Sequence, residues 1–453
     1  MRRLLGIRNV RVYVLGQVLS LFGSTSLWLA MGIWVKTLTG SNGAAGLVFF
    51  AFALPQLFAP LSGMLVDRVR RRPLLLVTNI AIGCVVLLLL VVHGVERVWL
   101  IYLVMVLYGA AYTVLSSGQA ALLKTIVPDD LLGEANAVLR TAQEGLRLVG
   151  PLTGAGLFAA FGGGAVAALD AVTFAGAALS LTLLRVDEAK PERDEEHWWA
   201  EITGGIRHIA RTRVLRQVTL GCGAAFLVIG FLESAGFAVV DQGLHRPASF
   251  IGVVIVAQGV GAVVSGPIAP AVMRHTGEVS LIGIALAVLA AGSLLLIAST
   301  LPVVLAGSLL LGFSLPWLVI GFNTLLQRRT PERLIGRVSA AADLLVGTPQ
   351  TISIAVGAVL ISLIDYRIML LTIAAVGASS AVYLTTRHEP PATPAEPSAP
   401  LTDSAALTDR NDSWLRSSRR WPIDDWSSMS SAYGRAMKVA GRCRPGHPRD
   451  TES

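Results

Sequence analysis

The sequence is poor in charged residues. Only 15% of its 453 residues are Asp, Glu, Lys or Arg, whereas soluble domains use about 25% to cover their surface. Cysteine is also scarce, with three in the chain, and Cys84 and Cys222 both fall within apolar runs. They form neither a disulfide framework nor a spaced metal site. The shortage of charge therefore excludes an ordinary soluble enzyme.

Sequence motifs of catalysis are missing as well. The chain has no H-E-x-x-H, no G-x-S-x-G and no P-loop, and its seven histidines are dispersed. These patterns hold a zinc ion, a nucleophilic serine or a nucleotide phosphate. We therefore expect no catalytic residues, no metal and no cofactor, and we do not expect an enzyme.

What the sequence does contain is apolar residues, which make up 53% of the chain and give a mean hydropathy of +0.64. They form twelve runs of about 20 residues, the length that spans the hydrocarbon of a bilayer. The predicted spans are 12–34, 44–66, 73–92, 98–121, 135–160, 164–184, 218–240, 250–272, 279–299, 301–326, 338–364 and 368–385. The first is too long for a signal peptide. The pattern predicts an all-α polytopic membrane protein with six spans on each side of a polar stretch.

Basic residues predict the orientation. The net charge is +8, and the basic residues cluster in one set of connections, as they do on the cytoplasmic side of a membrane. This explains the basicity without a nucleic-acid partner. Both termini are expected in the cytoplasm. The predicted divisions are an N-terminal bundle at 1–185, a central loop at 186–216, a C-terminal bundle at 217–387 and a tail at 388–453.

The two polar segments differ in pattern. In the central loop, Trp198, Ile202, Ile206 and Ile209 recur at helical spacing, which favours an amphipathic helix at the membrane interface; a solvated linker is the alternative. The tail is rich in Pro, Ser, Thr and Asp without apolar periodicity, and this composition predicts disorder.

An internal repeat relates the two sets of spans. The segments 128–138 and 331–341 are similar and lie 203 positions apart (331 − 128). The same offset brings Gly63, near the end of the second span, onto Gly266, near the end of the eighth. A parallel duplication of six helices places a substrate site between two halves that rock against each other.

The connection after the second span carries a motif. Residues 63–72 read G-M-L-V-D-R-V-R-R-R, which resembles the loop signature G-x-L-x-D-R-x-x-R-R of the major facilitator superfamily. The resemblance covers about residues 8–387 and implies twelve helices in two pseudo-symmetric six-helix bundles. The residues that match the signature are Gly63, Leu65, Asp67, Arg68, Arg71 and Arg72. Gly63 is expected to permit close helix packing, and the arginines to anchor the loop at the cytoplasmic face.

A second element lies in the fifth span. Gly150, Pro151 and Gly154 resemble the G-P-x-x-G element of the superfamily's drug exporters, although ordinary helix packing explains these residues equally well. Pro55, Asn136 and the segment 170–174 are similar to the macrolide-efflux branch. Two features depart from the pattern: Val106 stands where many proton-coupled exporters have an arginine, and Pro270 replaces the aspartate in the second copy of the loop signature.

Polar residues within the spans are the candidate transport residues, because ionisable groups in a bilayer normally face a cavity or a partner. Glu144 and Arg147 form either a cavity element or a structural ion pair. Glu233 is the favoured site for a proton or a cation, while Asp170 is expected to be mainly structural. Proton and substrate candidates together are Glu144, Arg147, Asp170, Glu233, Gln17, Trp28 and Asn323, with Gln56, Gln119, Gln258, Gln350 and Phe322 as further positions that could line the path.

The repeat and the resemblance together suggest charge pairs between the halves. In the superfamily, helix two faces helix eleven and helix five faces helix eight. Asp67 is then expected near Arg337, and Glu134, which the repeat makes equivalent to Arg337, near Arg274. We predict two cytoplasmic latches that close when the outside is open, each worth only about 0 to 1 kcal/mol.

The expected function is export of an amphipathic small molecule, drug-like or macrolide-like, by alternating access and in exchange for protons. Import or facilitated passage of a metabolite or lipid is the alternative, and a non-transporting receptor or scaffold is a third. The expected partners are the small-molecule substrate, protons and the lipid bilayer, with the protein acting as a monomer. The expected location is a bacterial plasma membrane.

Overall fold

The protein is described from a computed structural model, which covers residues 6–128, 131–184, 186, 198–331 and 334–386. The described residues contain helices and connecting turns and no strand. The tail and most of the polar stretch before the central helix lie outside them. The all-α prediction is confirmed.

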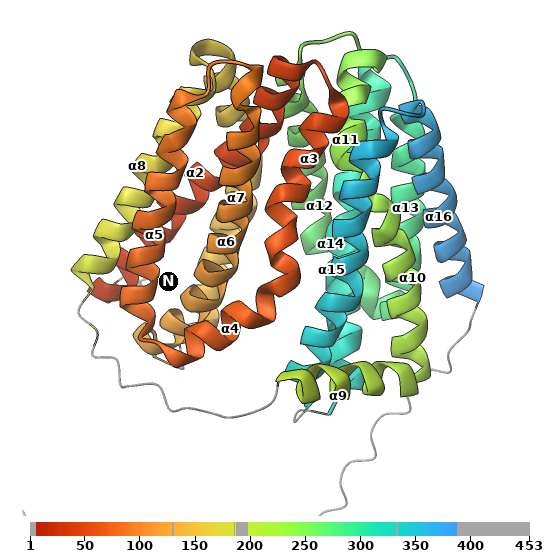
Figure 1. The fold of residues 1–453 in the computed structure, drawn as a ribbon. Helices are drawn as coiled ribbons and strands as arrows, with labels where there is room; N and C mark the ends of the chain where they lie inside the picture. The colour runs from red at the N-terminus through yellow and green to blue at the C-terminus, as the bar shows by residue number, and fades with distance from the viewer. Residues whose placement is uncertain (1–5, 129–130, 185, 187–197, 332–333, 387–453) are drawn as a thin grey trace, which may run out of the picture. The chain divides into compact units, whose positions relative to one another are not determined.

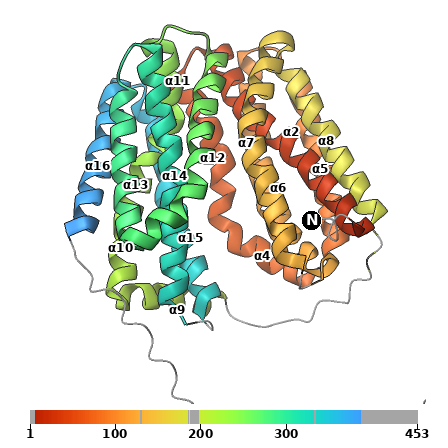
Figure 2. The same ribbon diagram turned by 180° about the vertical axis from the view of Figure 1, so that it is seen from behind.

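The helices fall into two sets, seen from two sides in Figures 1 and 2. The N-half contains α2 (Arg8–Thr39), α3 (Asn42–Ala53), η1 (Leu54–Phe58), α4 (Ala59–Arg68), α5 (Arg71–Leu87), η2 (Leu88–Val91), η3 (Val95–Arg97), α6 (Val98–Ile126), α7 (Leu132–Phe161) and α8 (Gly163–Leu183). The C-half contains α10 (Arg213–Ile229), α11 (Phe231–Ala238), η5 (Val239–Gly243), η6 (Ala248–Phe250), α12 (Ile251–Thr276), α13 (Glu278–Leu295), α14 (Leu301–Arg329), α15 (Ile335–Leu360) and α16 (Tyr366–Thr386).

Ten of the helical segments in the described residues are long and apolar enough to cross a membrane. The two predicted spans outside this set differ for physical reasons. The second is interrupted, because Pro55 follows α3 and the chain passes through η1 before α4. The fifth corresponds to α7, whose 30 residues include the charged side chains of Glu134, Arg140, Glu144 and Arg147. The count of twelve stays a prediction.

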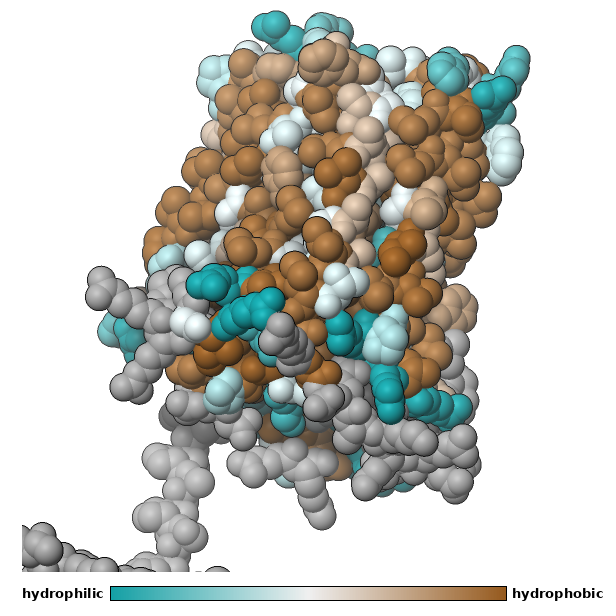
Figure 3. Space-filling model, turned by 90° about the vertical axis from the view of Figure 1, so that its left-hand side faces the viewer, coloured by the Kyte–Doolittle hydropathy of each residue, from teal (hydrophilic) through white to brown (hydrophobic). Residues whose placement is uncertain are grey.

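Apolar side chains cover the sides of the helical body. Figure 3 shows a broad hydrophobic band between more polar ends on the face formed by α5 and α8. Val77 of α5 is 63% exposed and Val172 of α8 is 66% exposed. Large exposed apolar surfaces of this kind need a lipid or protein partner, and a band around membrane-length helices fits lipid. The chain is a multi-pass membrane protein.

Each half has its own apolar core. One buried cluster runs from Val10 to Leu184 and the other from Ile209 to Leu384. A third, smaller cluster joins the halves through Ile33 and Phe49 of the N-half and Phe237 of the C-half. Each half therefore packs around its own core, and the two halves also share a smaller apolar cluster, as two bodies that rock against each other would.

The amphipathic segment of the central loop forms α9 (Trp198–Arg211), drawn below the C-half in Figure 1. It packs on the start of α15: a Cβ added at Gly205 would lie 2.2 Å from the Arg337 carbonyl oxygen. His208 contacts the Arg329 carbonyl oxygen at 3.4 Å. The helix is thus attached to the C-half at the junction of α14 and α15.

Candidate functional site

A cavity of about 870 Å³ lies between the two halves. The broken segment α3, η1 and α4 forms one wall, and α15 forms the wall opposite. The lining residues come from both halves: Trp28, Phe49, Phe52, Ala53, Gln56, Leu57, Ala59, Gly63, Met64, Tyr112, Thr113, Ser116, Glu233, Gly336, Arg337, Ala340, Asp343, Leu344, Gly347, Thr348, Gln350, Thr351 and Ile354. Its size is that of a site for a drug-sized molecule.

Three charged side chains line the cavity. Glu233 comes from α11, and Arg337 and Asp343 come from α15. Glu233 is half-buried, and among the described residues no hydrogen bond or ion pair reaches its carboxylate. The excess of carboxylate over guanidinium favours a cationic ligand in this space.

The chain positions Glu233 through a close helix contact. At Gly230, between α10 and α11, an added Cβ would lie 2.6 Å from the Ile354 backbone nitrogen and 2.8 Å from the Gln350 carbonyl oxygen. Only glycine allows this approach of the backbone to α15. Glu233 follows less than one turn later and faces the cavity beside Gln350 and Ile354.

Aromatic side chains close the cavity at one end. The ring centroids of Trp28 and Phe49 lie 4.6 Å apart, and those of Phe49 and Phe237 lie 6.1 Å apart. Gly32 makes room for this group, because a Cβ there would come within 2.8 Å of Phe237 and 2.9 Å of Phe49. Phe237 belongs to the C-half, so the aromatic group joins the two halves above the cavity.

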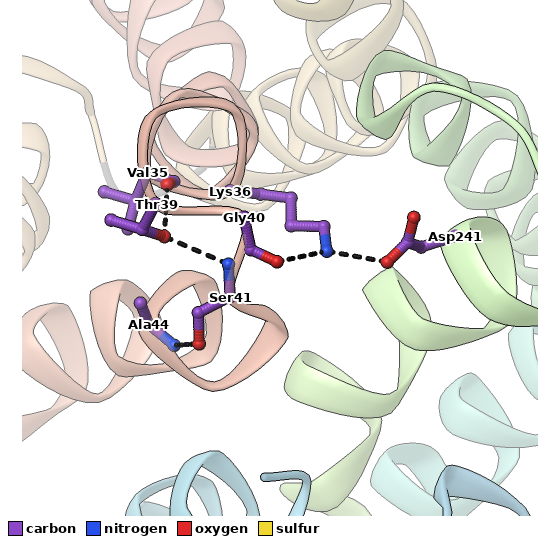
Figure 4. Close-up of polar contacts among 7 residues, drawn as sticks. All are labelled: Val35, Lys36, Thr39, Gly40, Ser41, Ala44 and Asp241. Carbon is purple, nitrogen blue, oxygen red and sulfur yellow. Dashed lines mark hydrogen bonds and ion pairs between the residues drawn. The ribbon is translucent and has the colours of Figure 1, made fainter. Parts of the chain in front are cut away.

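We call the end of the bundle beyond this aromatic group the opposite end, and the end with the α4–α5 and α14–α15 connections the basic end. At the opposite end Lys36 of α2 donates to Asp241 Oδ2 at 2.7 Å and to the Gly40 carbonyl oxygen at 2.8 Å (Figure 4). The Lys36 side chain is 10% exposed and that of Asp241 is 44% exposed. The lysine thus caps its own helix and ties the N-half to the C-half.

Glycines bring the halves together beside this ion pair. A Cβ at Gly43 of α3 would lie 2.3 Å from the Ala358 carbonyl oxygen of α15, and one at Gly46 would lie 1.9 Å from Ser234 Oγ of α11. Both contacts cross between the halves. The opposite end is therefore closed and tightly packed.

The basic end is different. A Cβ at Gly63 or at Gly336 would meet no atom within 4 Å, although both residues line the cavity. The prediction that Gly63 permits close helix packing is therefore wrong for this conformation, because the helix that would approach α4 stands away from it. The cavity reaches this end of the protein.

The arginines of the loop motif have separate roles. Arg72 donates to the carbonyl oxygens of Leu181 and Thr182 at 2.8 and 2.9 Å, and so caps the end of α8. Arg71 donates to Thr125 Oγ1 of α6 at 3.4 Å. Arg68 and Leu65 are exposed. The side chain of Asp67 lies outside the described part of the structure.

The Gly-Pro element of α7 is a packing surface toward two helices. A Cβ at Gly150 would lie 2.1 Å from Thr25 Oγ1, and one at Gly154 would lie 2.2 Å from the Ser26 carbonyl oxygen, so α7 lies directly on α2. On its other side, Pro151 and Ala155 contact Gly252 of α12. This is the expected approach of helix five to helix eight.

Several predicted candidates do not line the cavity. Glu144 and Arg147 form an i, i+3 ion pair at 3.7 Å with both side chains exposed, the structural arrangement that the sequence left open. Gln17, Asn323, Gln119, Gln258 and Phe322 are also absent from the cavity lining, and Asp170 is buried within the N-half. The cavity brings together Trp28, Glu233, Gln56, Gln350 and Arg337 from the predicted set.

The structure does not test the predicted latch between Asp67 and Arg337, because the Asp67 side chain lies outside the described residues. Glu134 and Arg274 are exposed and no ion pair joins them in the described residues. Arg328 instead pairs with Glu278 at the basic end. Because the latches are expected to close when the opposite end opens, they stay a prediction.

Two acidic residues at these sites, Asp343 and Asp241, were not among the candidates predicted from the sequence. Asp343 stands on α15 six residues after Arg337, and it lies within the predicted eleventh span, where a carboxylate is a signal in itself. Asp241 lies just beyond the end of the predicted seventh span and resembles any loop carboxylate. Its partner Lys36 is 205 positions away, so sequence offered no sign of the pair.

The geometry agrees with the comparisons to known proteins. The model of the Major Facilitator Superfamily matches residues 13–349 and 241–434. The chain belongs to this superfamily. It is a transporter of the major facilitator type, and curated protein sequences contain no match to it.

Solved structures share the fold at low identity. A bacterial homologue of the iron transporter ferroportin in an inward-facing state is 17% identical with a TM-score of 0.65, and the match covers 84% of this chain and 98% of that one. PepTSo, a POT family transporter, is 11% identical with a TM-score of 0.68, covering 84% and 97%. The nucleoside transporter NupG is 12% identical with a TM-score of 0.66, covering 84% and 100%.

Proposed function

We propose that this major facilitator exports an amphipathic organic cation from the cytoplasm by alternating access, in exchange for protons. The observation that carries the proposal is the cavity: it reaches the basic end, it is closed at the opposite end, and it combines aromatic side chains with Glu233 and Asp343. Apolar walls with a few fixed polar groups suit a drug-sized amphipathic ligand. Carboxylates suit a positive charge on it.

The orientation supports loading from the cytoplasm. The basic end carries Arg68, Arg70, Arg328 and Arg329, and basic connections stay on the cytoplasmic side. The conformation is then inward-open, with Lys36 and Asp241 at the outer face. Export requires the opposite end to open and the basic end to close, which is the step that the predicted latches would stabilise.

The two carboxylates are expected to have separable tasks. Glu233 is half-buried and lies about one turn before Phe237 of the aromatic group, whereas Asp343 is exposed and lies about two turns after Gly336 at the basic end. A cation therefore meets Asp343 first and Glu233 at the end of its path. Loss of Glu233 leaves the apolar end of the cavity without a counter-charge and has the larger effect.

The test uses inside-out membrane vesicles with an acidic lumen and ethidium as the probe. Wild-type protein is expected to concentrate the dye in the lumen, and collapse of the pH gradient abolishes uptake. Glu233→Gln lowers the initial rate about tenfold or more, equivalent to about 1.4 kcal/mol, and Asp343→Asn lowers it less. Glu144→Gln is the matched control, because it removes a carboxylate outside the cavity.

Three results would contradict the proposal. Equal ethidium uptake in vesicles with and without the protein argues against a cationic drug-like substrate. Dye movement only in right-side-out vesicles makes the protein an importer. A Glu144→Gln variant that loses as much activity as Glu233→Gln removes the special role of the cavity.

A further inference from the structure

A carboxyl group is enclosed within the N-half, away from the cavity. Asp170 of α8 has no exposed surface. Its Oδ2 lies 3.1 Å from the hydroxyl oxygen of Tyr108 on α6, and its Oδ1 lies 3.4 Å from Thr173 Oγ1. These partners are hydroxyl groups, and within the described residues no lysine or arginine pairs with Asp170. An ionised carboxylate in such a place is strongly disfavoured, so the neutral acid fits this conformation.

The hydrogens of the surrounding hydroxyl groups support the neutral acid. Each hydroxyl has one hydrogen to donate. Ser24 Oγ lies 2.9 Å from the Ser20 carbonyl oxygen, the Tyr108 hydroxyl lies 2.8 Å from Ser24 Oγ, and Thr173 Oγ1 lies 2.7 Å from the Asp170 carbonyl oxygen. When all three hydrogens serve these short contacts, the Tyr108 oxygen is left as an acceptor. The hydrogen in its contact with Asp170 then comes from the carboxyl group.

The result is a chain of donations that crosses three helices. Protonated Asp170 donates to Tyr108, Tyr108 donates to Ser24, and Ser24 donates to the Ser20 carbonyl oxygen of α2. Loss of the carboxyl proton reverses the order: Tyr108 donates to the carboxylate and Ser24 donates to Tyr108. The Ser20 carbonyl oxygen then loses the Ser24 donor. One proton thus changes a bond on α2, which carries Trp28 to the cavity and Lys36 to the opposite end.

Other titratable groups on the neighbouring helices do not contact the carboxyl group. From α2, Gly23 faces it, and a Cβ there would lie 2.5 Å from Asp170 Oδ1. From α6, Tyr108 is the titratable group in contact. The remaining ionisable residues of the packed helices are Arg8, Arg11, Tyr13 and Lys36 of α2, Arg71, Arg72 and Cys84 of α5, Tyr102, Tyr112 and Lys124 of α6, and Glu134, Arg140, Glu144 and Arg147 of α7.

We propose that Asp170 is a proton-binding site of the transport cycle, with Tyr108 and Ser24 as positioning residues that pass its protonation state to α2. The released proton goes to water that enters from the cavity when the packing of Tyr108 against Phe52 opens: the two rings lie 6.1 Å apart, and Phe52 and Tyr112 both line the cavity. This assignment rests on the proposed proton-coupled export. It places the proton apart from the substrate carboxylates, so that the two ligands communicate through α2.

Infrared difference spectroscopy of the full chain in lipid nanodiscs tests the site without any transport. A carbonyl-stretch band of a protonated carboxyl group is expected to disappear as the pH is raised. Asp170→Asn abolishes the band, whereas Glu144→Gln leaves it unchanged. Tyr108→Phe shifts the band to higher frequency, because the acid loses its acceptor, and this variant keeps the test valid if Asp170→Asn does not fold.

Distance measurements test the link to α2. Spin labels are placed on Val95→Cys and Leu363→Cys, exposed positions of the two halves outside the cavity, after the native cysteines are replaced by serine. In the wild-type background a longer-distance population grows as the pH is raised. Asp170→Asn, which stays neutral, keeps the short distance at every pH. Glu144→Gln again serves as the control.

The outcomes separate this inference from the proposed function. A band that survives in Asp170→Asn, or one that does not move in Tyr108→Phe, overturns the site. A pH-dependent distance that persists in Asp170→Asn overturns the link to α2. Absence of ethidium transport with both spectroscopic results intact overturns the substrate proposal and leaves the proton site standing.

Discussion

The two ends of this transporter use glycine in opposite ways. At the opposite end, Gly43 and Gly46 lie against backbone and side-chain atoms of the other half, at distances that leave no space for a Cβ. At the basic end, Gly63 and Gly336 line an open cavity and meet nothing within 4 Å. Small residues let helices approach closely, but they do so only at the end that is closed. The glycines therefore mark where the halves touch in one state and, because helix two is expected to face helix eleven, where they are expected to touch in the other.

The largest effect is expected when a side chain fills the contact between the halves at the closed end. Gly43→Val places a branched side chain against the Ala358 carbonyl oxygen. Overpacking costs about 1 to 3 kcal/mol, which corresponds to an increase of about 5-fold to 150-fold in the population with that end open. The measurement is labelling, from the opposite end, of a cysteine introduced at Trp28, which belongs to the aromatic group and lines the cavity.

Gly63→Val is the matched control for that experiment. It introduces the same side chain into a helix at the open end, where an added Cβ meets no atom within 4 Å. It is expected not to raise labelling from the opposite end. Because Gly63 lies where the halves are expected to meet in the other state, any change is a decrease. Equal labelling of the two variants would mean that the closed end is not held by its glycine contacts.

The contact of Arg72 on α5 with the end of α8 is expected to stabilise the fold. It is not expected to change the equilibrium between the inward-open and outward-open states. Arg72→Ala removes two donors from the end of α8, and loss of such a cap costs about 1 to 2 kcal/mol. Thermal unfolding in detergent should show a lowered melting temperature. Arg68→Ala, which changes an exposed neighbour, is expected to change the melting temperature little. A clear shift in cysteine labelling with Arg72→Ala would show that the contact between α5 and α8 changes during transport.

The ion pair at the closed end gives a smaller effect. Lys36→Glu places two carboxylates together and is expected to shift the balance toward the outward-open state by about 1 kcal/mol, roughly fivefold. The double variant Lys36→Glu with Asp241→Lys restores the pair. Distances between spin labels at Val95→Cys and Leu363→Cys report the change, and failure of the double variant to return to the wild-type distance would show that the charges do not hold this end.

The smallest effect is expected at the basic end. Arg337→Asp removes the predicted partner of Asp67 in the outward-open state, and an exposed pair contributes about 0 to 1 kcal/mol. The variant should favour the inward-open state, and adding Asp67→Arg should reverse the change. The accessibility of a cysteine introduced at Met64, which lines the cavity near Gly63, measures both. A double variant that behaves like Arg337→Asp alone would contradict the latch.

Some of the cavity-lining residues were candidates from the sequence, because an ionisable group within a span normally faces a cavity or a partner. Glu233, Trp28 and Arg337 line the cavity, and their roles in transport stay predictions. Glu144 does not line the cavity, because a carboxylate three residues before an arginine can form an ion pair on the helix surface. Asp170 was expected to be mainly structural, and its place among hydroxyl groups of three helices came from tertiary contacts that no spacing in one helix reveals.

By itself the sequence determined that this chain is an all-helical membrane protein of the major facilitator type, because span length, basic connections and the loop motif are local properties of the chain. The helix interruption at Pro55 is also a local property that the sequence can predict, because proline lacks the backbone N–H donor. Only the tertiary structure decided which end is closed, which carboxylates share the cavity, and that Lys36 meets Asp241. These features depend on how the two packed halves lie against each other. The inward-open and outward-open states of such a transporter differ by only about a few kcal/mol, so one sequence must be compatible with both.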